Sequence, residues 1–255
     1  MDRLSALMSR FTLSVRSCAI EEANFVIIAE ARNSRPAYLI YSAGEELGLL
    51  EPDKSAVLLS ARVTWGGPQN PLLAALPDEV RQDLTNDLEM QAIVDLLLAE
   101  QTAARCGSAS VLNRLGEVLL VRLMRRQIEQ GEMQVGLLGG LADSRLSRAI
   151  VAIHHQPGHD WRVDLLAQEA GLSVSRFAEL FRRSVGTTPL AYLRRWRLTL
   201  ARQDLERGDR VQRVANRYCY GSPEALSRAV SQEYGQTPIQ IRKAAAAQND
   251  AFPVS

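Results

Sequence analysis

Apolar residues recur every three to four positions through residues 161–189, which is the pattern of amphipathic helices that bury one face. Asp160 is predicted to cap a first helix, which ends at a tight turn on Gly171. Ser173 is predicted as the N-cap of a second helix, whose apolar stripe includes Phe177 and whose outer side carries arginines. The pattern therefore predicts two short helices joined by a glycine turn.

The same pattern returns about fifty residues later in the chain, at one constant offset. Ser222 repeats the N-cap, and Pro223 follows at the first helical position, which needs no N–H donor. Thr188-Pro189 and Thr237-Pro238 each predict the start of a further helix, and Gln240 completes a capping box with Thr237. The corresponding residues are Phe177, Phe181, Gly186, Thr188, Pro189 and Tyr192 in the first copy and Leu226, Val230, Gly235, Thr237, Pro238 and Ile241 in the second.

A helix, a glycine turn and a second helix with cations are typical of the helix-turn-helix, whose second helix enters the DNA major groove. Two copies on one chain predict two recognition helices, Ser173–Val185 and Ser222–Tyr234. The helix Pro189–Arg207 is predicted to bridge them by burying Leu193, Trp196, Leu200 and Leu205. Three arginines on that helix fit intra-domain ion pairs as well as they fit DNA contacts: Arg194, Arg195 and Arg197.

Residues 141–243 resemble the DNA-binding domain of AraC/XylS-type transcription regulators, a pair of helix-turn-helix units bridged by a long helix. The residues that carry this resemblance are Trp161, Leu166, Ala167, Gly171, Ser173, Phe177, Phe181, Gly186, Pro189, Tyr192, Trp196, Arg197, Ala201, Ala215, Tyr220, Ser222, Arg228, Gly235, Pro238 and Arg242.

Most departures from that family lie in the second copy. The family usually has glycine at the position of Cys219, aromatic residues at those of Leu226 and Val230, and a basic pair at those of Ser231 and Gln232. These differences predict a weaker grip on DNA phosphates in the second copy.

The resemblance implies base contacts near Ser175, Ala178 and Glu179, and DNA backbone contacts near Arg182 and Arg183. An arginine can bind guanine or phosphate, and a glutamate can accept from cytosine N4. A solvated helix face is the alternative interpretation. The predicted DNA-binding residues are Ser173, Ser175, Arg176, Ala178, Glu179, Arg182 and Arg183 on the first recognition helix, and Ser222, Glu224, Ser227, Arg228 and Ser231 on the second.

The charge distribution supports this interpretation. Residues 1–140 carry 13 Lys and Arg against 18 Asp and Glu, whereas residues 141–243 carry 17 against 10. The half with the repeat is therefore the basic half, as expected when a module that binds a polyanion is joined to a different module.

The first half of the chain predicts a small β-rich domain with helices. Short β-branched or aromatic segments at Phe11–Cys18, Phe25–Ala29, Tyr38–Tyr41 and Val57–Val63 are predicted as strands. Amphipathic patterns at Leu84–Ala104 and Ser110–Gln130 predict helices. The predicted fold class is therefore α+β, with an all-α double helix-turn-helix domain after the β-rich domain.

This half is similar to the cupin-type sensor domain of some AraC-type regulators. The resemblance rests on residues 1–4, the Asn-Pro-Leu-Leu segment from Asn70, and the helix around Leu112–Arg126. Residues 1–140 contain no histidine, so we expect no metal site, no cofactor and no enzymatic cupin, and the barrel is predicted to be shortened or incomplete. The alternative function is a small-molecule-binding cupin protein with a helical partner-binding module.

The predicted domains are residues 1–135, 141–243 and a tail at 244–255, with the glycine-rich segment Gly131–Gly140 as the linker. Charged residues interrupt the first 18 residues, which therefore lack the apolar core of a signal peptide. The chain also lacks a run of about 20 apolar residues that could span a bilayer, so a cytoplasmic protein without membrane contact is expected. The expected partners are double-stranded DNA, RNA polymerase, a second copy of the chain, and a small-molecule or redox effector.

The histidines and cysteines carry little predicted chemistry. Adjacent residues on a helix project about 100° apart, so His154 and His155 do not converge on one ion, and a favourable position at a helix C-terminus suits them better. Cys18, Cys106 and Cys219 predict no disulfide framework, and buried packing is the expected role for each, with redox sensing as the alternative.

Overall fold

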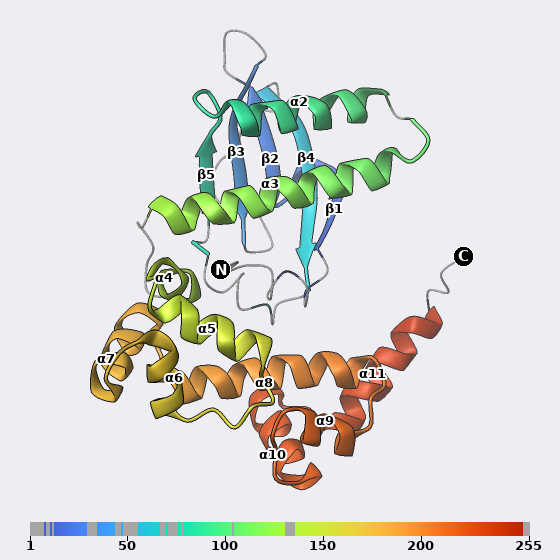
Figure 1. Cartoon of the computed structure of the whole chain (residues 1–255). Coiled ribbons are helices and arrows are strands. Elements are labelled where there is room, and N and C mark those ends of the chain that lie inside the picture. Colours follow the sequence, from blue (N-terminus) through green and yellow to red (C-terminus); the bar gives the residue numbers. More distant parts are fainter. Residues whose placement is uncertain are drawn as a thin grey trace. The chain divides into compact units, whose positions relative to one another are not determined.

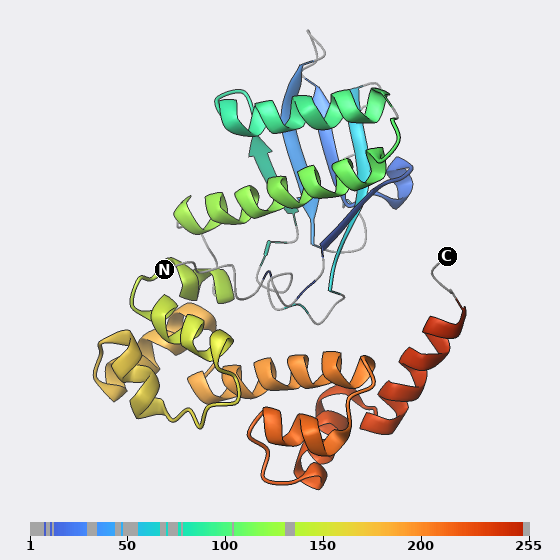
Figure 2. The same cartoon turned by 45° about the vertical axis from the view of Figure 1, so that its right-hand side comes forward.

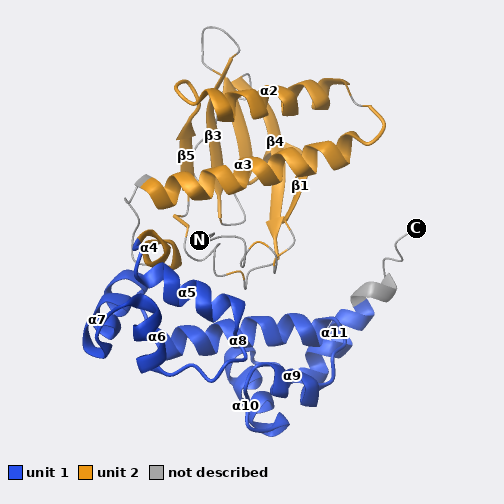
Figure 3. Cartoon of the chain, in the orientation of Figure 1, with its two compact units in different colours: residues 1–6, 143–255 blue, residues 7–142 orange. Residues whose placement is uncertain are grey.

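The computed structural model describes residues 8, 11, 13–29, 35–43, 47, 56–66, 70, 76–77, 79–103, 105–130 and 136–251. The chain divides into two compact units, residues 7–142 and 143–255 (Figure 3). The segment at residues 1–4 and most of the Asn-Pro-Leu-Leu segment, on which the cupin resemblance partly rests, lie outside the described residues.

The N-terminal unit is built on an antiparallel sheet with the strand order β1-β4-β2-β3-β5 (Figure 1). Phe25 of β2 pairs with Tyr41 of β3 on one side and with Ala61 of β4 on the other. The strands are β1 (Leu13–Ser17), β2 (Phe25–Ala29), β3 (Pro36–Ser42), β4 (Val57–Trp65) and β5 (Glu79–Asp83), and a 3₁₀ turn, η1 (Ile20–Glu22), follows β1.

One face of this sheet is apolar and is covered by α2 (Leu88–Ala103) and α3 (Ser108–Gln130), which lie across the strands in both views (Figures 1 and 2). Helix α3 approaches β1 closely because residue 116 is glycine: a Cβ there would lie 2.7 Å from a methyl carbon of Val15. The side-chain oxygen of Asn113 also accepts a hydrogen bond from the backbone N–H of Val15 at 2.6 Å. This bond satisfies a donor that an edge strand would otherwise expose.

The opposite face of the sheet is only partly apolar. Ala23, Val26 and Ile40 form a small buried cluster there, with Cys18 and Ile28 packed against it. The four predicted strands are present, and β5 is an addition that the sequence pattern missed. Val80 and Gln82 are the buried residues of β5. Because Gln82 is polar, the sequence lacks the regular alternation of apolar and polar residues that identifies a strand.

The C-terminal unit is helical throughout. Helix α8 contacts α6 and α7 near its start and α9, α10 and α11 near its end, so it bridges the two helix-turn-helix copies as predicted. The helices are α5 (Leu146–His155), α6 (Val163–Ala170), α7 (Val174–Val185), α8 (Pro189–Glu206), α9 (Val211–Arg217), α10 (Pro223–Tyr234) and α11 (Pro238–Ala251).

Three local predictions need correction. Part of the predicted linker forms a helix, α4 (Leu137–Ala142), because Leu137, Leu138 and Leu141 are buried. Asp160 does not cap α6: the N-cap position is Arg162, whose side chain makes no capping bond. The predicted tail also continues α11 as far as Ala251, because alanines at residues 244–247 sustain a helix.

Candidate nucleic-acid interface

Helix α7 is defined at both ends by local interactions. The Ser173 hydroxyl accepts a hydrogen bond from the backbone N–H of Arg176 at 3.4 Å, and Gly186 ends the helix with a φ of 81°. Phe177, Leu180 and Phe181 are buried, as the hydrophobic pattern predicts. The opposite side of α7 is left as a free outer face.

Helix α10 repeats this design. The Ser222 hydroxyl accepts from the N–H of Ala225 at 3.2 Å, Pro223 occupies the first turn, and Gly235 ends the helix with a φ of 65°. The following helix begins with the predicted capping box, in which the side-chain oxygen of Gln240 accepts from the N–H of Thr237 at 2.8 Å. Because their caps are equivalent, the two recognition helices have the same length, and residues at the same distance from the cap point in the same direction around each helix.

The predicted DNA-binding residues occupy the outer faces of these helices. On α7, all of them are exposed except Ala178, which is half-buried. On α10, Glu224 and Arg228 are exposed, whereas the three serines are half-buried. The first outer face consists of Ser173, Ser175, Arg176, Ala178, Glu179, Arg182 and Arg183, and the second of Ser222, Glu224, Ser227, Arg228 and Ser231.

Charge is arranged differently on the two outer faces. On α7, Arg176 forms an ion pair with Glu179 at 2.9 Å, while Arg182 and Arg183 form no ion pair with any described residue. On α10, the Ser222 hydroxyl bonded to the Glu224 carboxylate lowers the pKa of that group. The first outer face therefore presents two unpaired guanidinium groups near the C-terminal end of its helix.

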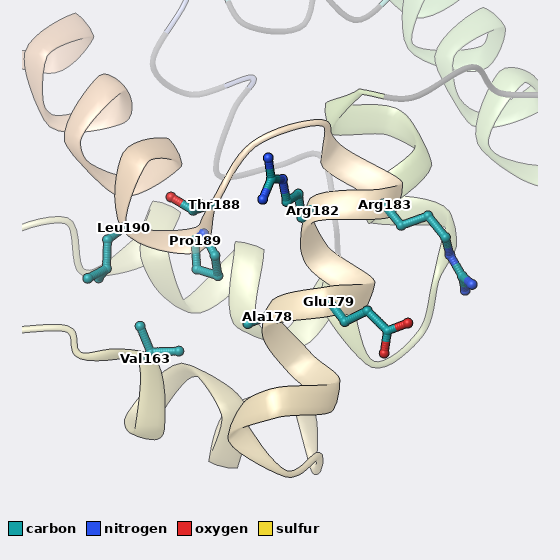
Figure 4. Close-up of a pocket in the computed structure, with 8 residues that line it drawn as sticks. All are labelled: Val163, Ala178, Glu179, Arg182, Arg183, Thr188, Pro189 and Leu190. Atoms are coloured by element: carbon teal, nitrogen blue, oxygen red, sulfur yellow. The ribbon is translucent and has the colours of Figure 1, made fainter.

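An open groove of about 670 Å³ borders the first outer face (Figure 4). Ala178 and Arg182 line one side of it, Val163 lies at the start of α6, and the first residues of α8 close it. Leu190 of α8 is 44% exposed and leaves apolar surface at this edge. Its lining residues are Val163, Ala178, Glu179, Arg182, Arg183, Thr188, Pro189 and Leu190.

The loop between α5 and α6 joins the two helix-turn-helix copies. The Arg197 guanidinium on α8 donates to the backbone carbonyls of Pro157 and His159, each at 2.7 Å. In the same loop, a Cβ on Gly158 would lie 2.2 Å from the carbonyl oxygen of Arg217 at the end of α9. Arg197 is therefore an intra-domain structural residue, and sequence reasoning did not identify Gly158, because its contact is with a residue far along the chain.

The other two arginines that the sequence left open differ from Arg197. Arg194 donates to the side-chain oxygen of Gln232 on α10 at 2.9 Å, so it also acts within the domain. Arg195 is exposed. Near the end of α8, Asp204 is buried and accepts from the Tyr218 hydroxyl at 2.7 Å and from Arg217, which attaches α9 to the bridge.

His154 is a core residue rather than a partner of the helix C-terminus. Its Nε2 lies 2.6 Å from the Tyr192 hydroxyl, and its ring packs against Trp196 with centroids 4.5 Å apart. Burial, together with the charge of His155, lowers the pKa of His154 to about 3. The imidazole is therefore neutral at physiological pH.

The cysteines correct another expectation, because Cys106 and Cys219 are exposed and only Cys18 is half-buried. Burial raises the pKa of the Cys18 thiol, which disfavours the reactive thiolate. Cys219 is the non-glycine residue with positive φ in the described part of the chain, at 59°. This left-handed backbone conformation favours glycine, which is the residue that the family usually has at this position.

The described residues contain no group of three or more histidine, cysteine, aspartate or glutamate side chains placed to hold a metal ion. None of their helices has the length and apolar character needed to span a bilayer.

Comparisons with known proteins define the class. A family model for a helix-turn-helix domain matches residues 166–244, and a family model for a cupin matches residues 20–129. The chain thus combines an N-terminal cupin domain with a C-terminal helix-turn-helix domain, which confirms the predicted fold class and the resemblance to AraC-type regulators.

The particular relatives are bacterial regulators. A protein of Streptomyces lividans named as an AraC-like transcription regulator is 34% identical over 69% of this chain and 59% of its own length. The HTH-type transcriptional regulator AlkR of Acinetobacter baylyi is 32% identical over 68% of this chain and 58% of its own length. The chain therefore spans about three-fifths of the length of these relatives.

Among solved structures, the DNA-binding domain of AdpA in complex with a target DNA aligns with 44% of this chain and 99% of its own, at 29% identity and a TM-score of 0.38. The family resemblance rests on the sequence matches. Both of these relatives are named as transcriptional regulators.

Proposed function

We propose that this protein is a sequence-specific, DNA-binding transcription regulator in which α7 and α10 read successive segments of the major groove. The observation that carries the proposal is the duplicated helix-turn-helix on one bridging helix. Both recognition helices have serine caps and glycine ends, and each has exposed charged residues on its outer face. Helices held in this way are the elements that reach base edges in helix-turn-helix proteins.

The affinity is proposed to come mainly from phosphates and the specificity from base edges. The unpaired guanidinium groups of Arg182 and Arg183 are suited to phosphate oxygens, and both residues line the groove beside the first recognition helix. The second outer face has Ser231 and Gln232 at the equivalent positions. We therefore propose that the first helix-turn-helix anchors the protein and the second mainly adds discrimination.

The N-terminal cupin domain is proposed to bind an effector or to mediate dimerisation. On α2, Leu88 is 79% exposed and Leu96 is 60% exposed, and helical spacing places them on one face with the exposed Ala92. Burying this face against a second copy of the chain would remove it from water, so a homodimer is the proposed assembly. An effector would act by differential affinity for two arrangements of the domains.

The remaining aspects of the proposal follow from the relatives. One of them is named a transcriptional activator, the RCS-specific regulator RclR of Escherichia coli. We propose that this protein likewise activates transcription, with RNA polymerase as a partner, in the bacterial cytoplasm where the chromosome lies. A cupin protein whose helical module binds another protein is not favoured by the matches to DNA-binding regulators.

The decisive experiment is titration of the full chain against pooled genomic DNA fragments at two salt concentrations, followed by sequencing of the bound fragments. We expect affinity to fall steeply with salt, by about 0.9 in log–log slope for each phosphate neutralised, and a restricted set of fragments to be enriched. Binding that is insensitive to salt, or the absence of any bound fragment, would remove the DNA-binding function.

A further inference from the structure

The loop between α5 and α6 is held in one conformation by its own residues. The indole N–H of Trp161 donates to the backbone carbonyl of Gln156 at 2.9 Å, and the backbone N–H of Trp161 donates to the carbonyl of His159 at 2.7 Å. The His159 ring also packs edge-on against Trp161, with centroids 4.6 Å apart. Because Trp161 is buried, the loop is anchored directly before α6.

This loop contacts both the bridging helix and the second helix-turn-helix (Figure 1). The Arg197 guanidinium of α8 donates to the carbonyls of Pro157 and His159, each at 2.7 Å. Between those two residues, Gly158 lies so close to the end of α9 that a Cβ would be 2.2 Å from the carbonyl oxygen of Arg217. Arg197 therefore holds the loop in a position where it meets α9.

Helix α8 by itself attaches each copy at a different point. The first copy packs at Tyr192, whose ring centroid lies 5.8 Å from that of Phe181, and the second is attached at Asp204, which accepts from the Tyr218 hydroxyl at 2.7 Å. At the rise of a helix these points are about 18 Å apart, so a bend or twist of α8 between them would displace α7 relative to α10. Arg197 lies between the two points, and the loop contact with α9 opposes such a change.

We propose that Arg197 is a positioning residue for DNA binding. By holding the α5–α6 loop against the end of α9, it fixes the separation and the relative rotation of α7 and α10. Recognition helices that are fixed in this way engage two half-sites together at one spacing only. This inference rests on the proposed DNA-binding function, and it names the residue that sets the half-site spacing.

A purely structural role for Arg197 would give a different result. Loss of stability reduces the fraction of protein that is competent to bind, which lowers the apparent affinity for every duplex by the same factor. Loss of the fixed spacing instead changes the ratio of the affinities for two duplexes that differ only in spacing. This ratio does not depend on the folded fraction.

The test measures affinity for the duplex that the wild type selects, with its half-sites located by footprinting, and for the same duplex with two base pairs inserted between them. The insertion moves one half-site by about 7 Å and about one-fifth of a turn. We expect the affinity of the wild-type full chain to fall about 10-fold and that of Arg197→Ala about 2-fold. Arg197→Lys should lie between them, because an ammonium group lacks the fork that reaches both carbonyls. Arg195→Ala, at an exposed position of the same helix, is the control and should keep the wild-type ratio.

Three results would overturn the proposal or its basis. A wild-type ratio in both Arg197 variants, or a wild type that is unaffected by the insertion, would show that Arg197 does not set the spacing. If Arg197→Ala bound no duplex, Arg197→Lys would decide, and a wild-type ratio in that variant would contradict the proposal. Failure of the wild type to bind any duplex would instead overturn the underlying DNA-binding function.

Discussion

In the first helix-turn-helix, α7 buries Phe177 and Phe181 and leaves two arginines unpaired, whereas in the second, α10 buries Leu226 and Val230 and carries Ser231 and Gln232 at the positions of those arginines. Their backbones are nevertheless alike, with serine caps and left-handed glycine ends. Caps and turns therefore preserve the geometry of each copy, while the side chains between them are free to diverge in charge and volume.

The two copies also differ in how they meet the rest of the domain. In the first copy, His154 is buried in the core, and the loop at Gly158 contacts the end of α9. The second is attached through the buried Asp204 and the bond between Arg194 and Gln232. Because each copy has its own contacts, a substitution can be chosen that affects one copy and not the other.

The largest expected effect is at the junction of the copies. Gly158→Ala places a Cβ 2.2 Å from the backbone carbonyl oxygen of Arg217, and a backbone atom cannot rotate away as a side chain can. We expect the free energy of unfolding to fall by about 3 kcal/mol, as for severe overpacking, measured by chemical denaturation. Gly221→Ala is the control, because a Cβ there meets no atom within 4 Å, and equal losses from both variants would show that the junction is not tight.

Acidification should destabilise the first copy through His154. The imidazole stays neutral in the folded protein down to about pH 3, but in the unfolded chain it takes up a proton below about pH 6.5. Its contribution to stability is therefore complete above pH 6.5 and is lost as the pH falls toward 3, with about 2 kcal/mol lost between pH 7 and pH 5. His154→Gln should remove this slope from denaturation curves, while a substitution of the exposed His155 should retain it. If the dependence of stability on pH persisted in His154→Gln, other titrating groups would be responsible for it.

The proposed difference in phosphate contacts between the two copies can be measured directly. The double variant Arg182→Ala/Arg183→Ala should bind DNA about 10-fold more weakly at low salt, and its log–log salt slope should be shallower by about 1.8. Ser231→Ala/Gln232→Ala is the matched variant in the second copy and should leave the slope unchanged. Equal slope changes would show that the two copies contribute phosphate contacts equally.

The smallest expected effect is at Cys219. Its φ of 59° is strained for a residue with a Cβ, so Cys219→Gly should stabilise the protein. The gain should be about 0.5 kcal/mol, because the greater freedom of glycine in the unfolded chain offsets part of the relieved strain. Cys219→Ala retains the Cβ and should change little. A loss of stability in the glycine variant would mean that the thiol itself makes a stabilising contact.

Several features of this protein were determined by its sequence. The serine caps, the glycine turns, the repeat and the strands from β1 to β4 were predicted, because each depends on interactions between residues a few positions apart. The exposed residues proposed to bind DNA were identified in the same way. Once the caps and the buried stripe are known, helical geometry determines which side chains face outward.

Only the tertiary structure decided the rest. The strand order of the sheet, the addition of β5, the contact between Gly158 and Arg217, and the burial of His154 beside Tyr192 all join residues far apart in the chain. The pairing of Arg176 with Glu179 is close in sequence, but helical spacing permits such a pair without requiring it. Local periodicity reports which face of an element is buried, and it contains no information on which distant surface buries it.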